Sequence, residues 1–503
     1  MYAVSLTPMR KTLLLAILLL LPPSLCAHVG SPDTFFEGDA GPYRLFVTVR
    51  MPEAIPGVAE VEIRSESGDV TAIRLLPLRL TGAGSEYAPK PELMERSAND
   101  PQFFSGRIWL MEFHALQLRV EVEGGRGVGT LAAPLMAEAQ RTLRMNKQLG
   151  SLLFSFMIFL AVTFVLILRA ALGEARLQPG EAYDTQSAGK LRWVTGAGVL
   201  FVMAIIYLGN TWWSAEASGY SLRVMKPPTF RAVLAPTGRL SLFPPEGQSS
   251  VHARLRSGGW LSWSEVLKDL RPDHGHLMHL FLVRMPTWDY FCHLHPESDP
   301  KGFFEQNLPS LPSGRYQMFS DVVTDTGLAI TMVGQIDLPE LSGTPLRGDD
   351  SVAATLSNPA AAGTQAVSAL QDGRMKWIRD PAPLRARTAL RLRFQVEDGE
   401  GKPALDLEPY MGMAGHLIIL RSDGGVFAHV HPTGSVAMAS LELAEKSLAS
   451  ATMQNMPSMA QQSLSSEVAF PYGFPQPGRY RLFVQVKHAG KIQTGVFDTI
   501  IEP

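Results

Sequence analysis

The chain has 503 residues, and its 45 Lys and Arg side chains nearly balance its 47 Asp and Glu side chains, giving a formal charge of −2. This balance provides no broad basic surface, so we expect no nucleic-acid partner. Apolar residues make up 46% of the chain and charged residues 18%, which excludes both a disordered chain and a protein that crosses a membrane many times.

Residues 1–27 have the features of a signal peptide. The basic residues Arg10 and Lys11 precede a short, unbroken apolar run that ends at a pair of prolines. We expect cleavage after Ala27, with lipidation of Cys26 as the alternative. The chain is therefore predicted to enter the export pathway of a bacterium.

Residues 28–140 alternate between apolar and polar side chains, as half-buried strands do. Tyr43, Leu45, Val47 and Val49 are predicted to share one face of such a strand. Pro and Gly residues separate several runs of this kind. The segment predicts a small immunoglobulin-like β-sandwich.

Two apolar segments then predict a transmembrane hairpin. Residues 148–168 and 193–213 are each long enough to cross a bilayer, and Trp212 and Trp213 suit its interface. An exported amino terminus would leave only the loop 169–192 in the cytoplasm. We therefore expect an integral protein of the bacterial inner membrane, with both large soluble regions on the periplasmic side.

An internal repeat follows the hairpin. The sequence HLFLVR at 279–284 corresponds to HLIILR at 416–421, and FCHLHP at 291–296 corresponds to FAHVHP at 427–432. Each copy predicts a strand, a turn and a second strand, followed by a Pro- and Gly-rich turn. The repeat therefore predicts two related β-sandwich domains.

These features together predict a mainly β protein. It consists of three immunoglobulin-like β-sandwich domains outside the membrane and a two-helix transmembrane hairpin. The repeated sandwiches are predicted at 230–340 and 383–503. A linker rich in Ser, Thr, Ala and Gly is predicted between them at 341–382.

The histidines of the repeat have a spacing that suits metal binding. Residues two apart in a strand point to the same face, so His293 and His295 should project together, as should His429 and His431. The neighbouring strand should bring a third histidine close to each pair. Where the first copy has further histidines before this strand, the second has methionines, and imidazole and thioether groups both bind copper. The predicted ligands, in two sites, are His276, His279, His293, His295, Met411, Met413, His416, His429 and His431.

The blocks at 411–416, 427–432 and 477–480 resemble those of YtkA-like and CopC-like exported β-sandwich domains. The amino-terminal domain and hairpin resemble uncharacterised bacterial membrane-anchored proteins of the same layout. This resemblance implies an immunoglobulin-like fold and a role in copper handling in the cell envelope.

The sequence contains no motif of a hydrolase, nucleotide-binding protein or metalloprotease, so we expect no enzyme. The first hypothesis is a membrane-anchored protein that binds copper and delivers it to a membrane-protein partner. Because neutral imidazole is the ligand, copper affinity is expected to fall as the pH drops through about 6. The alternative is a non-metal envelope scaffold in which the histidines are structural.

Overall fold

The computed structural model describes residues 32–503, apart from 83–87, 175–177, 179, 182–184, 223, 244–266, 268, 300–302, 356–365 and 453–463. The predicted signal peptide at 1–27, with Cys26, lies outside the described residues.

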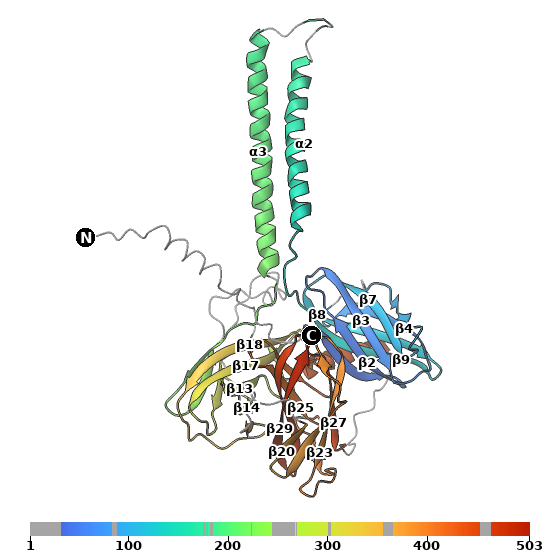
Figure 1. The fold of residues 1–503 in the computed structure, drawn as a ribbon, viewed down its shortest axis with the longest axis vertical. Coiled ribbons are helices and arrows are strands. Elements are labelled where there is room, and N and C mark those ends of the chain that lie inside the picture. The colour runs from blue at the N-terminus through green and yellow to red at the C-terminus, as the bar shows by residue number, and fades with distance from the viewer. Residues whose placement is uncertain are drawn as a thin grey trace, which may run out of the picture.

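The described chain is mainly β, as predicted. Six sheets pair face to face into three immunoglobulin-like sandwiches, and two long helices form a hairpin. The three sandwiches lie together at one end of this hairpin (Figure 1). We call them the amino-terminal sandwich, sandwich A and sandwich B in chain order.

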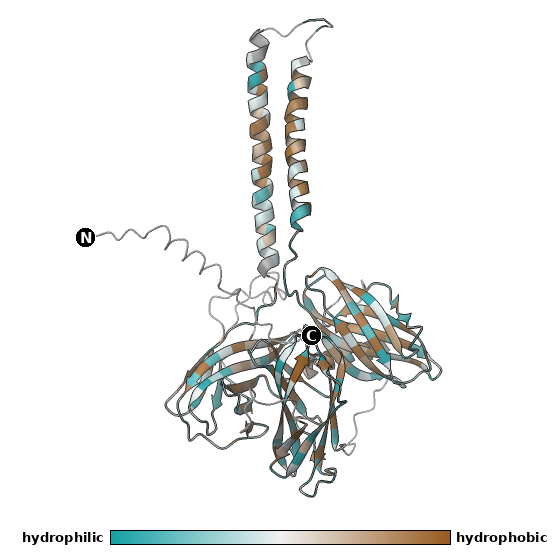
Figure 2. Ribbon diagram, in the orientation of Figure 1, coloured by the Kyte–Doolittle hydropathy of each residue, from teal (hydrophilic) through white to brown (hydrophobic). Residues whose placement is uncertain are grey.

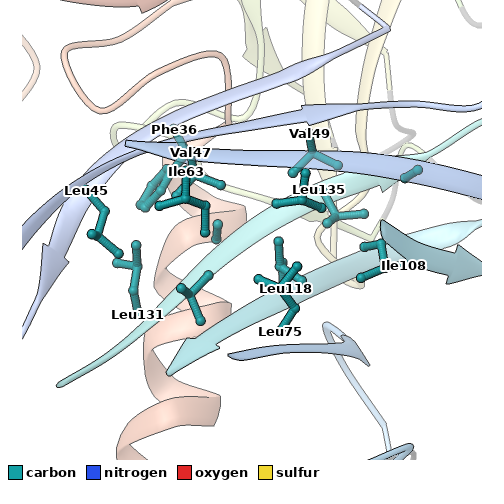
Figure 3. Packing of buried hydrophobic residues seen from close by; sticks show 14 of the residues in the cluster. Phe36, Leu45, Val47, Val49, Ile63, Leu75, Ile108, Leu118, Leu131 and Leu135 are labelled. Atoms are coloured by element: carbon teal, nitrogen blue, oxygen red, sulfur yellow. The ribbon is translucent and has the colours of Figure 1, made fainter. Parts of the chain in front are cut away.

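The amino-terminal sandwich has nine strands among its described residues. One sheet contains β1 (Thr34–Ala40), β2 (Tyr43–Arg50), β3 (Gly57–Ser65), β7 (Phe103–Leu110) and β6 (Glu95–Arg96). The other contains β5 (Glu92–Leu93), β4 (Val70–Arg79), β8 (His114–Gly124) and β9 (Gly127–Ala137). Leu45 and Val47 of the first sheet pack with Leu75 and Leu118 of the second (Figure 3). The predicted alternation therefore corresponds to a buried face.

The hairpin consists of α2 (Lys147–Glu174) and α3 (Thr185–Leu222). Both helices carry an apolar segment long enough to span a bilayer (Figure 2), and almost none of the residues in these segments are buried within the protein. The helices are longer than the predicted spans at both ends. The amide of Met225 donates to the carbonyl of Ala139, so the chain segments flanking the hairpin are held together at its base.

Sandwich A pairs a four-stranded sheet with a larger one. The first contains β10 (Arg231–Leu234), β11 (Arg239–Phe243), β16 (Phe304–Asn307) and β15 (Glu297–Ser298). The second contains β12 (Leu270–Arg271), β17 (Gly314–Thr324), β13 (His279–Met285), β14 (Tyr290–Leu294), β19 (Ser351–Ala354) and β18 (Ala329–Leu338).

Sandwich B repeats this plan. One sheet contains β20 (Val367–Leu370), β21 (Gly373–Ile378), β23 (Leu390–Glu397) and β27 (Glu467–Tyr472). The other contains β22 (Leu384–Arg385), β29 (Lys491–Glu502), β28 (Gly478–His488), β25 (His416–Arg421), β26 (Phe427–Val430) and β24 (Leu407–Glu408). A helix, α6 (Met438–Thr452), follows β26.

The structure corrects the predicted linker at 341–382, because three strands, β19, β20 and β21, lie within it. Strand β19 pairs with β14 and completes a sheet of sandwich A. Strands β20 and β21 belong to sandwich B, where β21 pairs with β23. The small residues of this stretch concealed strand segments, because a strand can be as short as about three or four residues.

Sandwiches A and B pack their larger sheets against each other. Phe291 of β14 stacks on Phe483 of β28 with ring centroids 4.2 Å apart, and Phe319 of β17 stacks on Phe427 of β26 at 4.3 Å. A single buried apolar cluster contains residues of both sheets. The interface between the two domains therefore has its own buried apolar core.

Helix α6 connects all three sandwiches. Leu441 belongs to the core of the amino-terminal sandwich, and the helix passes beside that core (Figure 3). Ala444 and Leu448 belong to the core of sandwich A. The amide of Ala439, in the first turn, donates to Oδ1 of Asp273 at 2.6 Å, so a carboxylate of sandwich A caps the helix.

Candidate metal centre

The histidines of both repeats converge between sandwiches A and B. In β13, Leu280 and Leu282 point into the core of sandwich A, so His279 and Phe281 point out of it towards sandwich B. In β25, His416 faces sandwich A in the same way, beside Ile418. One end of the interface is therefore apolar and aromatic, and the other is filled with imidazoles.

Two equivalent turns bring further residues to the cluster. Asp273 and His276 pair across a turn in sandwich A, as Tyr410 and Met413 do in sandwich B. Both central residues of each turn have positive φ, 52° and 84° for His274 and Gly275, and 50° and 79° for Met411 and Gly412. Such a two-residue turn requires this conformation. His274 and Met411 therefore occupy equivalent positions in the two turns, and so do His276 and Met413. This equivalence agrees with the alignment of the repeats, in which methionines of the second copy replace histidines of the first.

The first triad of histidines comes entirely from sandwich A. Nδ1 of His279 lies 3.0 Å from Nε2 of His293, and a ligand nitrogen of His295 lies within 4.8 Å of both rings' ligand atoms. All three side chains are buried. Nε2 of His295 is buried without a hydrogen-bond partner in the described part of the chain. These are three of the predicted ligands, and the structure brings them together.

The second triad crosses the domain boundary. His274 of sandwich A meets His416 and His431 of sandwich B, with one ligand nitrogen of each within 4.8 Å of the others. Nε2 of His274 lies 3.2 Å from Nε2 of His431. The sequence-based grouping of ligands by repeat therefore misses His274, which the structure places among the histidines of the other copy.

The last two histidines lie against these triads. Nε2 of His429 is 3.1 Å from Nδ1 of His416. The ring of His276 stacks on that of His295 with centroids 3.9 Å apart. These eight histidines thus belong to one continuous cluster.

Each of the eight rings has one nitrogen facing an oxygen outside the cluster. Backbone carbonyls bind Nδ1 of His274 and His431 and Nε2 of His279 and His416, at 2.8 to 3.2 Å. For the other four rings, the outer oxygen belongs to a carboxylate or to a side-chain amide. These outer partners are Asp349 for His276, Gln485 for His293, Asp350 for His295 and Asp321 for His429.

Three of these partners belong to the opposite sandwich from their imidazole: the carbonyl of Met411, which contacts His274, and two side chains. Gln485, which is opposite His416 in sandwich B, places Oε1 2.8 Å from Nδ1 of His293 in sandwich A. Asp321, which is opposite His279 in sandwich A, places Oδ2 3.4 Å from Nδ1 of His429 in sandwich B. Sequence reasoning missed both residues, although each occupies the strand position directly opposite a predicted ligand.

Burial favours the neutral form of the fully buried imidazoles. Desolvation, followed by repulsion from neighbouring rings, lowers the pKa of His279, His293, His416 and His429 well below 6.5. Desolvation lowers the pKa of His431 to about 3. Neutral imidazole is the form that binds metals. The fall in copper affinity near pH 6 stays a prediction, and lowered pKa values of this kind would move it to lower pH.

The sulfur-containing residues contribute differently. Met411 enters the cluster through its backbone carbonyl, which accepts a hydrogen bond from His274. Metal binding by the thioethers of Met411 and Met413 stays a prediction.

Cys292 is a buried, free cysteine in the core of sandwich A, where desolvation raises the pKa of its thiol. This environment suits an inert thiol.

The comparisons with known proteins identify part of sandwich B. Residues 369–502 match the family model described as "Domain of unknown function (DUF8832)". This match starts within the stretch predicted as linker. No curated protein matches the chain. The resemblance to YtkA-like and CopC-like domains stays a prediction.

Several solved structures are similar to the chain. They include latent PorU from Porphyromonas gingivalis, with 9% identity over 94% of this chain and 34% of that one, and a TM-score of 0.14. Salmonella alpha-2-macroglobulin reacted with methylamine has 9% identity over 96% of this chain and 24% of that one, and a TM-score of 0.19. A putative membrane anchored protein from Corynebacterium diphtheriae has 7% identity over 94% and 96% of the chains, and a TM-score of 0.14. The chain spans about a third and a quarter of the first two proteins.

Proposed function

We propose that this protein is membrane-anchored and binds a transition-metal ion, copper first, in the histidine cluster between sandwiches A and B. One observation carries the proposal. Eight imidazoles each direct one nitrogen to an outer oxygen, and six of them form two triads whose ligand nitrogens lie within 4.8 Å of one another. Metal-binding histidines are oriented by outer hydrogen bonds of this kind.

The donor set suits copper better than the common hard cations. Imidazole nitrogens bind copper, zinc, nickel and iron, whereas calcium and magnesium require oxygen ligands. Among divalent ions of the first transition row, copper(II) has the highest general affinity for nitrogen sites. When bound, copper would supply a redox-active cation, while the chain supplies a buried set of neutral ligands.

The two apolar helices support membrane association, and the three sandwiches share one end of the hairpin (Figure 1). We propose that this end lies on the periplasmic side of the bacterial inner membrane. Copper held there could pass to a neighbouring membrane protein. The chain is proposed to act as a binding protein and not as an enzyme.

The proposal is tested by loading the detergent-solubilised full chain with copper and measuring bound metal by mass spectrometry after gel filtration. His295→Ala removes an inward nitrogen and should lower the copper bound per chain. His114→Ala is a matched control, because His114 lies at the start of β8, outside the cluster, and pairs with Glu112. Absence of copper, zinc and nickel from the unmodified chain would refute the proposal.

The scaffold alternative rests on the same outer contacts. A ring bonded to a carbonyl or carboxylate also stabilises the turn or strand that carries this partner. A purely structural cluster predicts that copper leaves the melting temperature unchanged, while His431→Ala lowers it with or without metal. A metal site predicts that copper raises the melting temperature of the unmodified chain.

A further inference from the structure

We infer that the cluster is a single centre for two metal ions, in which the second ion is held across the domain boundary by His274, His416 and His431. The inference rests on the proposed function, because it specifies how many ions bind and which rings hold them. The sequence-based hypothesis assigned one site to each repeat. In the structure the second site belongs to neither repeat alone.

The protonation of His274 and His431 provides the first step. Nδ1 of each ring contacts a backbone carbonyl, that of Met411 at 2.8 Å and that of Val436 at 2.9 Å. A carbonyl only accepts hydrogen bonds, so both Nδ1 atoms carry the proton of the neutral ring. Both Nε2 atoms then carry a lone pair, and the two atoms face each other at 3.2 Å. This pair requires a cation or an added proton between its members.

His416 completes the second site. Its Nε2 lies 3.2 Å from the carbonyl of Tyr410, so its Nδ1 carries the lone pair. A ligand atom of this ring lies within 4.8 Å of those of His274 and His431. Both His416 and His431 are buried, with 0% and 2% of their surface exposed. A metal ion bound to the three converging nitrogens would satisfy all three lone pairs at once.

The first site is built in the same way from sandwich A. Nε2 of His279 lies 3.1 Å from the carbonyl of Asp273, which leaves a lone pair on Nδ1. Nδ1 of His295 donates a hydrogen bond to Asp350, so Nε2, which has no hydrogen-bond partner among the described residues, carries a lone pair. The Gln485 amide donates to Ser351, so its Oε1 accepts from Nδ1 of His293. The inward nitrogen of each ring in this triad can then bind a metal ion.

The two sites share one space. The ring of His279 lies 6.0 Å from that of His274, and the ring of His293 lies 6.3 Å from that of His416, measured between centroids. His429 lies between the triads, 5.5 Å from His279 and 5.3 Å from His416. Two ions bound here would be separated only by imidazoles and would interact magnetically.

The second ion would also link the two sandwiches. His274 belongs to the turn whose Asp273 caps helix α6, whereas His431 and its carbonyl partner Val436 lie just before that helix. An ion bonded to both rings would bridge the turn and this segment. Loss of the second ion alone should therefore reduce the stabilisation that copper gives to the domain interface.

The test is a copper(II) titration of the detergent-solubilised full chain, with metal analysis and electron paramagnetic resonance (EPR). We expect two ions per chain and a signal that is broadened or diminished relative to two isolated ions. His431→Asn keeps a side-chain amide donor towards Val436 but removes the inward lone pair. It should reduce binding to one ion, with the spectrum of an isolated copper(II) centre.

The one ion that His431→Asn should still bind also shows that this variant is folded, because the first site forms only in the folded protein. His295→Ala should likewise leave one ion, and His114→Ala should leave two. Two coupled ions in His431→Asn, or a single ion in the unmodified chain, would overturn the inference while leaving the proposed function intact. An unmodified chain that binds no metal would overturn both.

Discussion

Nδ1 of His293 in sandwich A lies 2.8 Å from Oε1 of Gln485 in sandwich B, and both groups are buried. The reciprocal contact joins His429 of sandwich B to Asp321 of sandwich A at 3.4 Å. Each sandwich therefore orients an imidazole of the other. A metal centre built in this way depends on the docking of the two domains as well as on the fold of each.

Gln485→Leu should weaken copper binding about 10- to 100-fold, the usual effect of losing an outer partner of a metal ligand. The leucine fills a similar volume but cannot accept a hydrogen bond from His293. The measurement is a competition titration against a copper chelator. Gln335→Leu is the control, since Gln335 bonds to Gln317 on β17, in an exposed contact. Equal affinities of the two variants would contradict the role of Gln485.

The metal-free protein should lose stability as the pH falls below about 6.5. Unfolded histidines take up protons near this pH, but the buried rings have lowered pKa values and stay neutral, so acid favours the unfolded chain. At pH 5 each such ring should cost about 2 kcal/mol of unfolding free energy. Above pH 6.5 this cost disappears, and the stability of the fold is fully retained.

Thermal unfolding of the metal-free chain between pH 7.5 and pH 5 measures this effect. Copper should raise the melting temperature at each pH at which the chain still binds it. A melting temperature that stays constant or rises as the pH falls would show that these rings are not buried and neutral.

Phe427→Ala should destabilise the interface between the sandwiches. Phe427 is buried, stacks on Phe319 and also contacts Phe281 at 5.3 Å between centroids. Losing such a side chain costs about 3–5 kcal/mol. Urea unfolding followed by tryptophan fluorescence should show this loss, and copper affinity should fall with it. Leu405→Ala, at a side chain that is 92% exposed, should change neither quantity appreciably.

The sequence predicted what depends on local periodicity. The positions of His279, His293 and His295 follow from strand alternation and one tight turn, and the structure brings these residues together. The contact between His274 and His431 could not be predicted in this way. It depends on how two sheets dock, and their docking faces have the same alternation of apolar side chains as any buried face.

The outer partners were missed for a related reason. Asp321 and Gln485 occupy polar positions of strands that are otherwise largely buried, which the sequence alone does not distinguish from solvent-facing positions. The register supplies a signal, since each lies directly opposite a predicted histidine ligand. A search for polar residues opposite paired histidines would have found both.

Arg481 of β28 forms a buried ion pair with Asp498 of β29, with two hydrogen bonds of 2.6 and 2.7 Å, and donates to the carbonyl of Trp288 in sandwich A. Asp498→Leu would leave the guanidinium buried without its counter-charge. We expect a loss of about 3–5 kcal/mol, because an unpaired buried charge is strongly unfavourable.

The double variant Arg481→Met with Asp498→Leu should recover part of this loss, since it removes both charges and keeps apolar volume at the interface. Urea unfolding of the three proteins measures the difference. If the double variant is less stable than Asp498→Leu alone, the hydrogen bond from Arg481 to Trp288 stabilises the interface more than the unpaired charge destabilises it. The contribution of this ion pair to domain docking would then be carried by Arg481 alone.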